Sequence, residues 1–218
     1  MLINLDNPEI YDEPFRHVIF RNCVNVDFQE VLEQADMLFS ENEGKLVQTE
    51  NYSKVEVKKA NGVCGELLKF MSGEVLLRVC EKYLNMQGLS TDPDYDGGGL
   101  TYSAPGKFLR YHYDFPYSNT TKKYRVVNAL LYLSNPCIRG GQLQLLDPKS
   151  GTVEASIEPT FGTLAMFPTS SETPHGVSKI KDHNRISINS YFYADQPLDD
   201  RLEPSKTIWL NEVKGVRH

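Results

Sequence analysis

The sequence predicts an α+β fold that is mainly β, in which N-terminal helices support a double-sheet jelly roll. Apolar residues recur at intervals of three and four only before residue 100, which is the spacing of an amphipathic helix. From residue 100 onward, short alternating segments are separated by Gly, Pro, Asn and Asp, as strands are separated by turns. About eight such strands suit a cupin-like double-stranded β-helix, because this architecture leaves few strand edges exposed.

Two segments of the N-terminal part have helical spacing. In the first, Asp27 followed by Glu30 has the form of a capping box that begins a helix. The second runs from about Val63 to Met86. We expect the apolar stripes of both segments to pack on one sheet of the jelly roll. The stripes consist of Phe28, Val31, Leu32, Ala35, Leu38 and Phe39 in the first segment and Leu67, Leu68, Met71, Val75, Leu76, Val79 and Tyr83 in the second.

The rest of the chain divides into strands, one long loop and a tail. Residues 87–99, rich in Gly and Asp, predict a flexible loop, with a lid over a site as the alternative. A length of 218 residues suits one integrated domain, with helical support over 1–99, a jelly-roll core over 100–195 and a packed tail over 196–218. In that tail, Trp209 is expected to make apolar packing contacts. The predicted strands are Leu100–Ala104, Phe108–Phe115, Val126–Leu133, Gln142–Leu146, Val153–Ile157, Thr163–Phe167, Gly176–Ile180 and Arg185–Tyr193.

Composition excludes several functional classes. The net charge of -6 argues against non-specific binding to nucleic acid or to an anionic membrane, because both require a basic surface. No apolar run approaches the roughly 20 residues of a membrane-spanning helix, and the acidic, polar first residues do not resemble a secretory leader. The four cysteines are scattered, which favours reduced thiols in a cytoplasmic protein over disulfides or a cysteine-based zinc site.

His112 and Asp114 are the first indication of a metal site. Residues two apart on a strand point to the same face, so these two side chains would lie together. His175 begins a later strand, and distant strands meet across the mouth of a jelly roll. Two histidines and one carboxylate form the facial triad of non-haem Fe(II) oxygenases, which leaves coordination positions open for substrate and O₂. The alternative for the pair alone is a surface histidine beside an acid.

Arg185 indicates an anion site. In the alternating strand that it begins, Ser187, Asn189 and Tyr191 point in the same direction as Arg185. A guanidinium inside a barrel requires an anionic partner, and a dicarboxylate ligand would accept bidentate hydrogen bonds from it. The alternative is an arginine paired with a carboxylate of the protein itself.

Residues on the neighbouring strands are further candidates for the same pocket. Tyr102 precedes His112 by ten residues and could donate a phenolic hydrogen bond to the same anion. Asn128 and Tyr132 project together from the following strand.

Taken in order, these residues resemble the iron- and 2-oxoglutarate-dependent dioxygenases, in particular the prolyl 4-hydroxylase-like branch. The resemblance covers about residues 100–194. It is carried by the motifs Tyr102-Ser103-Ala104-Pro105-Gly106, His112-Tyr113-Asp114, Leu131-Tyr132-Leu133-Ser134-Asn135, Gly140-Gly141, Phe161-Gly162 and His175-Gly176, and by Arg185 with Ser187.

The resemblance implies a role for each candidate. His112, Asp114 and His175 would hold Fe(II), and Arg185 would pair with the distal carboxylate of the co-substrate 2-oxoglutarate. Tyr102 and Ser187 would assist Arg185. The implied pocket walls are Tyr132, Asn128 and Tyr191.

The implied activity is hydroxylation of an unactivated C–H bond with O₂, release of succinate and CO₂, and ascorbate as a candidate reductant. A prolyl residue in a peptide or protein is the expected substrate. Aromatic residues in the segment 115–124 would suit a proline ring, whereas Lys122, Lys123 and Arg125 would suit an anionic small molecule. A free amino acid or another metabolite is therefore the alternative. Leu109 and Arg185 stand where collagen-type enzymes often have tyrosine and lysine, which argues against a collagen-type substrate.

Two other classes remain open at this point. A non-catalytic jelly-roll binding protein could keep a metal for structure only, although such a site needs no anion-binding arginine. A zinc hydrolase could use the same three ligands with a bound water, although no glutamate is placed as an obvious base.

Overall fold

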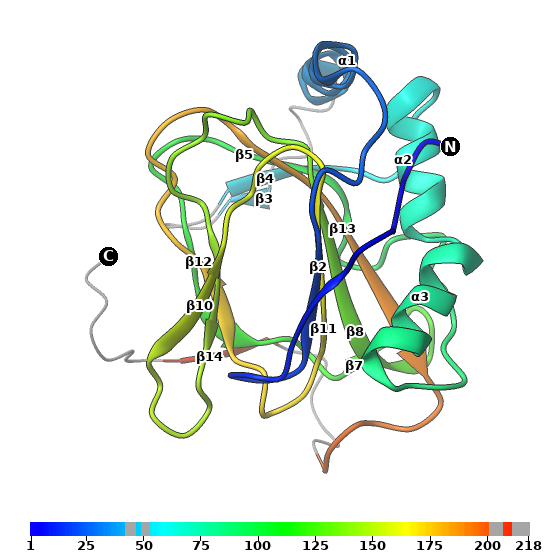
Figure 1. The fold of residues 1–218 in the computed structure, drawn as a ribbon, viewed down its shortest axis with the longest axis vertical. Helices are drawn as coiled ribbons and strands as arrows, with labels where there is room; N and C mark the ends of the chain where they lie inside the picture. Colours follow the sequence, from blue (N-terminus) through cyan, green and yellow to red (C-terminus); the bar gives the residue numbers. More distant parts are fainter. Residues whose placement is uncertain (42–46, 49–52, 201–206, 211–218) are drawn as a thin grey trace.

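The computed structural model describes residues 1–41, 47–48, 53–200 and 207–210. Within these ranges, two antiparallel sheets face each other and helices cover the outer face of the larger sheet (Figure 1). In order across it, the larger sheet contains β1 (Glu9–Tyr11), β2 (His17–Phe20), β11 (Thr163–Pro168), β8 (Lys123–Tyr132), β13 (Arg185–Ala194), β5 (Gly99–Ser103), β4 (Ser53–Val57) and β3 (Val47–Gln48), with β7 (Tyr117–Ser118) paired to β8. The smaller sheet contains β10 (Val153–Ile157), β9 (Leu143–Leu146), β12 (His175–Val177), β6 (Leu109–Tyr113) and β14 (Ile208–Trp209).

The predicted mainly-β, jelly-roll class is confirmed. Each of the eight predicted strands is present, as β5, β6, β8, β9, β10, β11, β12 and β13. The N-terminal part differs from the prediction because it contributes strands as well as helices. β2 is buried at all four positions, so it has no alternation of polar and apolar residues that would have identified it as a strand. It pairs with β1 on one side and with β11 on the other.

The helices are α1 (Phe28–Glu41), α2 (Gly62–Met71) and α3 (Glu74–Leu84). The backbone N–H of Glu30 donates to the side chain of Asp27 at 3.1 Å, as the capping box predicts. The second predicted helical segment is interrupted at Ser72 and Gly73, so it forms two helices. The interruption changes the helical phase, and Val75, expected in the core, is 64% exposed.

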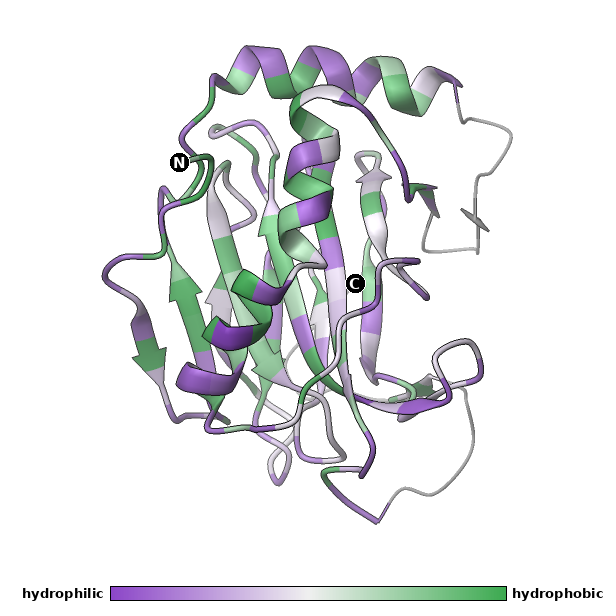
Figure 2. Ribbon diagram, turned by 90° about the vertical axis from the view of Figure 1, so that its right-hand side faces the viewer, coloured by the Kyte–Doolittle hydropathy of each residue, from purple (hydrophilic) through white to green (hydrophobic). Residues whose placement is uncertain are grey.

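Strand alternation divides the core into two parts. Residues of β8 and β13 that face the helices join a large cluster with α1, α2 and α3, and Figure 2 shows these helices lying across the sheet. On β8, Ala129 and Leu131 belong to this cluster, whereas Leu130 and Tyr132 point between the two sheets into a smaller cluster. The space between the sheets is therefore lined by every second residue of each strand. No helix in the described part of the chain is long and apolar enough to cross a membrane.

Residues 196–200 and 207–210 of the predicted tail are described, and the latter contain the short strand β14 at the edge of the smaller sheet. Residues 201–206 and 211–218 of the predicted tail lie outside the described residues. Trp209 is 45% exposed, so it is not enclosed by apolar packing; its ring lies instead beside the His112 ring and the Arg110 guanidinium.

Candidate active site

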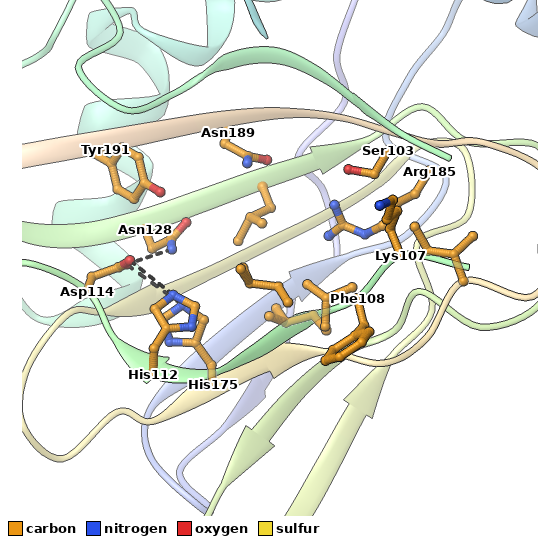
Figure 3. Close-up of a pocket in the computed structure, with 15 residues that line it drawn as sticks. Ser103, Lys107, Phe108, His112, Asp114, Asn128, His175, Arg185, Asn189 and Tyr191 are labelled. Atoms are coloured by element: carbon orange, nitrogen blue, oxygen red, sulfur yellow. Dashed lines mark hydrogen bonds and ion pairs between the residues drawn. The ribbon is translucent and has the colours of Figure 1, made fainter. Parts of the chain in front are cut away.

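His112, Asp114 and His175 come together between the sheets. His112 lies on β6, Asp114 follows the end of that strand, and His175 begins β12. The antiparallel register places His175 directly opposite His112. One ligand atom from each residue lies within 4.8 Å of those of the other two, and all three side chains are buried (Figure 3). The strand pairing therefore assembles the three residues that the sequence singled out.

The close approach of β12 to β6 depends on Gly176. A Cβ at this position would lie 2.7 Å from the Tyr111 ring and 2.9 Å from the Leu109 carbonyl oxygen. Since real Cβ atoms do not approach other atoms so closely, any larger residue would push the two strands apart. Glycine after His175 thus keeps the two imidazoles within reach of each other, with ring centroids 4.5 Å apart.

Hydrogen bonds set the orientation of each candidate ligand. Nδ1 of His112 lies 2.8 Å from the carbonyl oxygen of Arg110, and Nδ1 of His175 lies 3.0 Å from that of Thr173. Because a carbonyl oxygen only accepts, both Nδ1 atoms must donate, and in the neutral ring Nε2 keeps its lone pair. The Asn128 amide donates to Oδ2 of Asp114 at 3.0 Å. Such outer contacts are typical of metal ligands held in place before the metal binds.

Electrostatics keep His175 and Asp114 in the protonation states that bind a metal. Burial and the neighbouring His112 together lower the pKa of His175 to about 4, so the imidazole is neutral at pH 7. Burial alone would raise the pKa of Asp114. The neighbouring His175, His112 and Arg125 side chains outweigh burial and hold the Asp114 pKa below its usual range. The site therefore offers a neutral His175 imidazole and the Asp114 carboxylate beside His112.

A pocket of about 520 Å³, counting its open mouth, extends from the ligand set to Arg185. The Arg185 guanidinium donates from Nε to the Gly141 carbonyl oxygen at 3.0 Å and from Nη1 to the Ser187 hydroxyl at 3.2 Å. Its Nη2 is buried without a hydrogen-bond partner in the described part of the chain. A buried donor of this kind is costly unless a ligand satisfies it. No carboxylate of the described residues pairs with Arg185, which disfavours the alternative of an internal ion pair.

The other predicted pocket residues differ in whether they line the pocket or contact Arg185. Asn128 and Tyr191 line the pocket, on β8 and β13 (Figure 3). Ser187 does not line it but accepts from Arg185, and so supports the guanidinium. The Tyr132 ring is buried, with its centroid 5.0 Å from the same guanidinium.

The placement of Tyr102 at the anion site is wrong. Its ring packs against Phe39 of α1, with ring centroids 4.9 Å apart, on the helix side of the larger sheet. The register pairs Tyr102 with Ile186 and Ser103 with Arg185, so Ser103 faces the pocket instead. A motif match cannot reveal this difference, because the face of each residue depends on which residues pair across the strands.

Sequence reasoning missed several residues that line the pocket. Lys107 and Ser103 lie with Arg185 at its far end, and apolar walls come from strands of both sheets (Figure 3). The strand period already placed Asn189 on the same face as Arg185, although no pocket role was assigned to it. Lys107 could not, because it lies in a turn before β6 where no periodicity applies. The apolar wall residues are Phe108, Leu109, Leu130, Leu143, Val177 and Ile180.

The basic residues of the segment after Asp114 are bound to the protein itself. The Arg125 guanidinium lies between the rings of Phe115 and Tyr191, 3.6 and 3.4 Å from their centroids, and donates to the Asp96 carbonyl oxygen. The Lys123 ammonium donates to Ser90 and pairs with a carboxylate. These contacts make the two side chains poor candidates for binding a free anion.

The predicted loop over residues 87–99 is attached to the core. Ser90 and Tyr193 exchange two main-chain hydrogen bonds of 2.7 and 3.0 Å, and Tyr95 is buried. None of the residues that line the pocket comes from 87–98, so this segment does not form a lid in the structure.

Comparisons with known proteins agree with this architecture. Residues 89–193 match the 2OG-Fe(II) oxygenase superfamily. Prolyl 3-hydroxylase 3 of Mus musculus is 37% identical over 65 residues, which are 30% of this chain; the human protein gives the same values. The matched part is only 9% of the length of these curated relatives.

Solved structures show the same fold. A Pseudomonas putida prolyl-4-hydroxylase superposes with a TM-score of 0.59 at 22% identity, over 83% of this chain and 93% of that one. A prolyl hydroxylase from Trichoplax adhaerens, in complex with a hypoxia inducible factor peptide fragment, superposes with a TM-score of 0.58 at 23% identity, over 81% and 83% of the two chains. Over residues 89–193 the chain is similar to the 2OG-Fe(II) oxygenase superfamily, and its fold is that of the prolyl 4-hydroxylases.

Proposed function

We propose that the protein is an Fe(II)- and 2-oxoglutarate-dependent dioxygenase that hydroxylates an unactivated C–H bond. One observation carries this proposal: a buried set of two imidazoles and one carboxylate lies at one end of a pocket, and a guanidinium with an unpartnered donor lies at the other. A metal site with a purely structural role does not need a buried guanidinium with an unpartnered donor. The match of residues 89–193 to the 2OG-Fe(II) oxygenase superfamily supports dependence on Fe(II) and 2-oxoglutarate.

His112, Asp114 and His175 would hold the iron. The donor set fits Fe(II), because nitrogen and carboxylate ligands on one face leave the remaining positions open. Bound Fe(II) would supply the oxidation of a C–H bond by O₂, coupled to conversion of 2-oxoglutarate to succinate and CO₂. The contribution of the protein is to present both Nε2 lone pairs and, through Asn128, to fix the Asp114 carboxylate.

Arg185 would hold the distal carboxylate of 2-oxoglutarate. Its unpartnered Nη2 supplies a charge-assisted donor, and Ser187 keeps the guanidinium in place by accepting from Nη1. Lys107 adds a second positive charge at this end of the pocket. The apolar walls between Arg185 and the ligand set, such as Leu143 and Val177, exclude water from the region where the co-substrate would react.

The expected primary substrate is a prolyl residue in a peptide or protein. Support comes from the relatives, which are prolyl hydroxylases, one of them in complex with a peptide fragment. In this chain, the Tyr191 ring lines the pocket and suits an apolar ring. A free amino acid or another metabolite is the alternative, and ascorbate is the proposed reductant.

The test is turnover of 2-oxoglutarate by the native protein with a panel of proline-containing peptides and free amino acids, with mass analysis of the products. Anaerobic addition of 2-oxoglutarate to the Fe(II) protein should produce a visible charge-transfer band, and admission of O₂ should produce succinate. Asp114→Ala should lose both signals, whereas the control Asp12→Ala, which changes a carboxylate on an exposed surface, should keep them.

Two results would contradict the proposal. Folded, iron-loaded native protein that forms neither the band nor succinate would indicate a non-catalytic metal-binding protein. Product formation that continues without O₂ would indicate a hydrolase that uses the same three ligands.

A further inference from the structure

Trp209 lies beside the proposed iron ligands, although it is far from them in the sequence. β14 pairs antiparallel with β6, and Trp209 is directly opposite His112. Residues in such a pair project from the same face of a sheet. The indole and the imidazole are accordingly in contact, with ring centroids 5.1 Å apart at an interplanar angle of 44°.

Main-chain and side-chain contacts hold the indole in this position. The N–H of Leu210 donates to the Tyr111 carbonyl oxygen at 2.9 Å. The Arg110 guanidinium donates to the Leu210 carbonyl oxygen at 3.3 Å and lies 5.9 Å from the centre of the Trp209 ring. The position of the ring is therefore set by β6, the strand that carries His112, and requires no bound ligand.

A large part of the indole nevertheless remains accessible. Trp209 is 45% exposed, whereas the His112 side chain that it touches is 5% exposed. The indole is not one of the side chains that line the pocket between His112 and Arg185. 2-Oxoglutarate in that pocket would therefore leave the exposed part of the indole free for a second molecule. Strand pairing thus places an exposed aromatic face beside a buried candidate metal ligand, where a substrate that approaches the site would contact it.

We infer that Trp209 is a substrate-contacting residue that binds the apolar ring of the residue to be oxidised. This inference rests on the proposed dioxygenase function and adds a specificity determinant to it. Flat aromatic faces are the usual partners of proline rings in extended peptides, because the rigid ring loses little entropy on binding. A tryptophan next to His112 would hold such a ring close to the iron while the rest of the peptide remains in solvent.

Steady-state kinetics of substitutions at positions 208 and 209 test the inference. Trp209→Ala should raise the KM for a hydroxylated proline-containing peptide by at least about tenfold, while the KM for 2-oxoglutarate changes much less. Trp209→Phe, which keeps an aromatic face, should recover most of the peptide affinity. The matched control is Ile208→Ala on the same strand, since Ile208 is 41% exposed and pairs with Tyr113. This control should leave both KM values unchanged.

Fluorescence gives a readout that does not depend on turnover. Trp209 is the only tryptophan of the chain, so the emission of the protein reports on this one site. Anaerobic addition of Fe(II) should quench the emission of the native protein but not that of His112→Ala. Further addition of the peptide, with 2-oxoglutarate present, should shift the emission again.

The outcomes separate this inference from the proposed function. If the native protein hydroxylates a peptide, but Trp209→Ala has an unchanged peptide KM and the peptide leaves the emission unchanged, the inference is wrong and the dioxygenase function stands. If the native protein forms no succinate, the dioxygenase function is wrong. If it forms succinate but hydroxylates no proline-containing peptide, the assignment of Trp209 to a proline ring is wrong.

Discussion

His112 and His175 lie directly opposite each other on the antiparallel strands β6 and β12, and their imidazole rings are 4.5 Å apart. Each ring donates from Nδ1 to a carbonyl oxygen of the residue two positions before it, Arg110 or Thr173. The same local hydrogen bond therefore orients both histidines, although they lie on two different strands. The consequence is that both Nε2 atoms face Asp114, at 3.6 and 3.8 Å from its carboxylate oxygens.

Asn128 is expected to control metal affinity through Asp114. Its amide donates to Oδ2 of Asp114 in a buried environment, and its loss would leave that carboxylate free to rotate. Asn128→Ala should weaken Fe(II) binding by about 10- to 100-fold. Titration of the metal-free protein with Fe(II) under anaerobic conditions measures this change. An affinity equal to that of the native protein would show that the hydrogen bond has no role in orienting the ligand.

Arg185 is expected to determine the affinity for 2-oxoglutarate. Arg185→Ala removes the charge-assisted donor at the end of the pocket and should cost about 2–4 kcal/mol, which is roughly a 30- to 900-fold higher KM for 2-oxoglutarate. Arg185→Lys should have a smaller effect, because it keeps the charge but loses the planar fork. Succinate formation over a range of co-substrate concentrations measures both effects. The far-ultraviolet spectrum of each variant should confirm folding, since Arg185 also contacts Gly141.

The stability of the metal-free protein should fall as the pH decreases from about 6.5 to about 4. Burial lowers the pKa of His175 to about 4 in the folded protein, whereas the unfolded imidazole titrates near 6.5. Between these two pH values the unfolded chain binds more protons than the folded protein, so lowering the pH favours unfolding. The contribution of His175 to the free energy of unfolding is on the order of 3 kcal/mol. This stabilising contribution is fully present above pH 6.5 and is lost below pH 4.

Chemical denaturation at several pH values checks this prediction. His175→Asn, which has no titrating ring at this position, should lose less stability than the native protein over the same pH range. Equal losses in the two proteins would show that His175 does not titrate as its burial predicts.

A single cysteine should react with thiol reagents in the folded protein. All four cysteines are free, and only Cys137 is exposed. Burial raises the pKa of Cys23 to about 12 and that of Cys64 to about 11, and it also raises the pKa of Cys80. Because the thiolate is the reactive form, these three should react slowly. Labelling at pH 8 should modify one thiol rapidly and four after unfolding, and Cys137→Ser should remove the rapid reaction.

Much of the site could be predicted because its residues follow local rules. His112 and Asp114 are two apart on one strand, and Arg185, Asn189 and Tyr191 alternate on another, so their common faces follow from the strand period alone. The face of Tyr102 could not be obtained in this way. That face depends on the pairing of β5 with β13, which joins residues more than 80 positions apart.

The amino-acid sequence alone determined the class of the fold, the eight core strands and the identity of the three candidate ligands and of Arg185. Helical and strand periods, turn residues and residue chemistry are properties of short segments, so they can be recognised without coordinates. Only the tertiary structure decided that Ser103 replaces Tyr102 at the pocket, that β2 enters the larger sheet and that Trp209 lies against His112. These features depend on pairing between distant strands, and the register of such pairing is set by packing of the whole core.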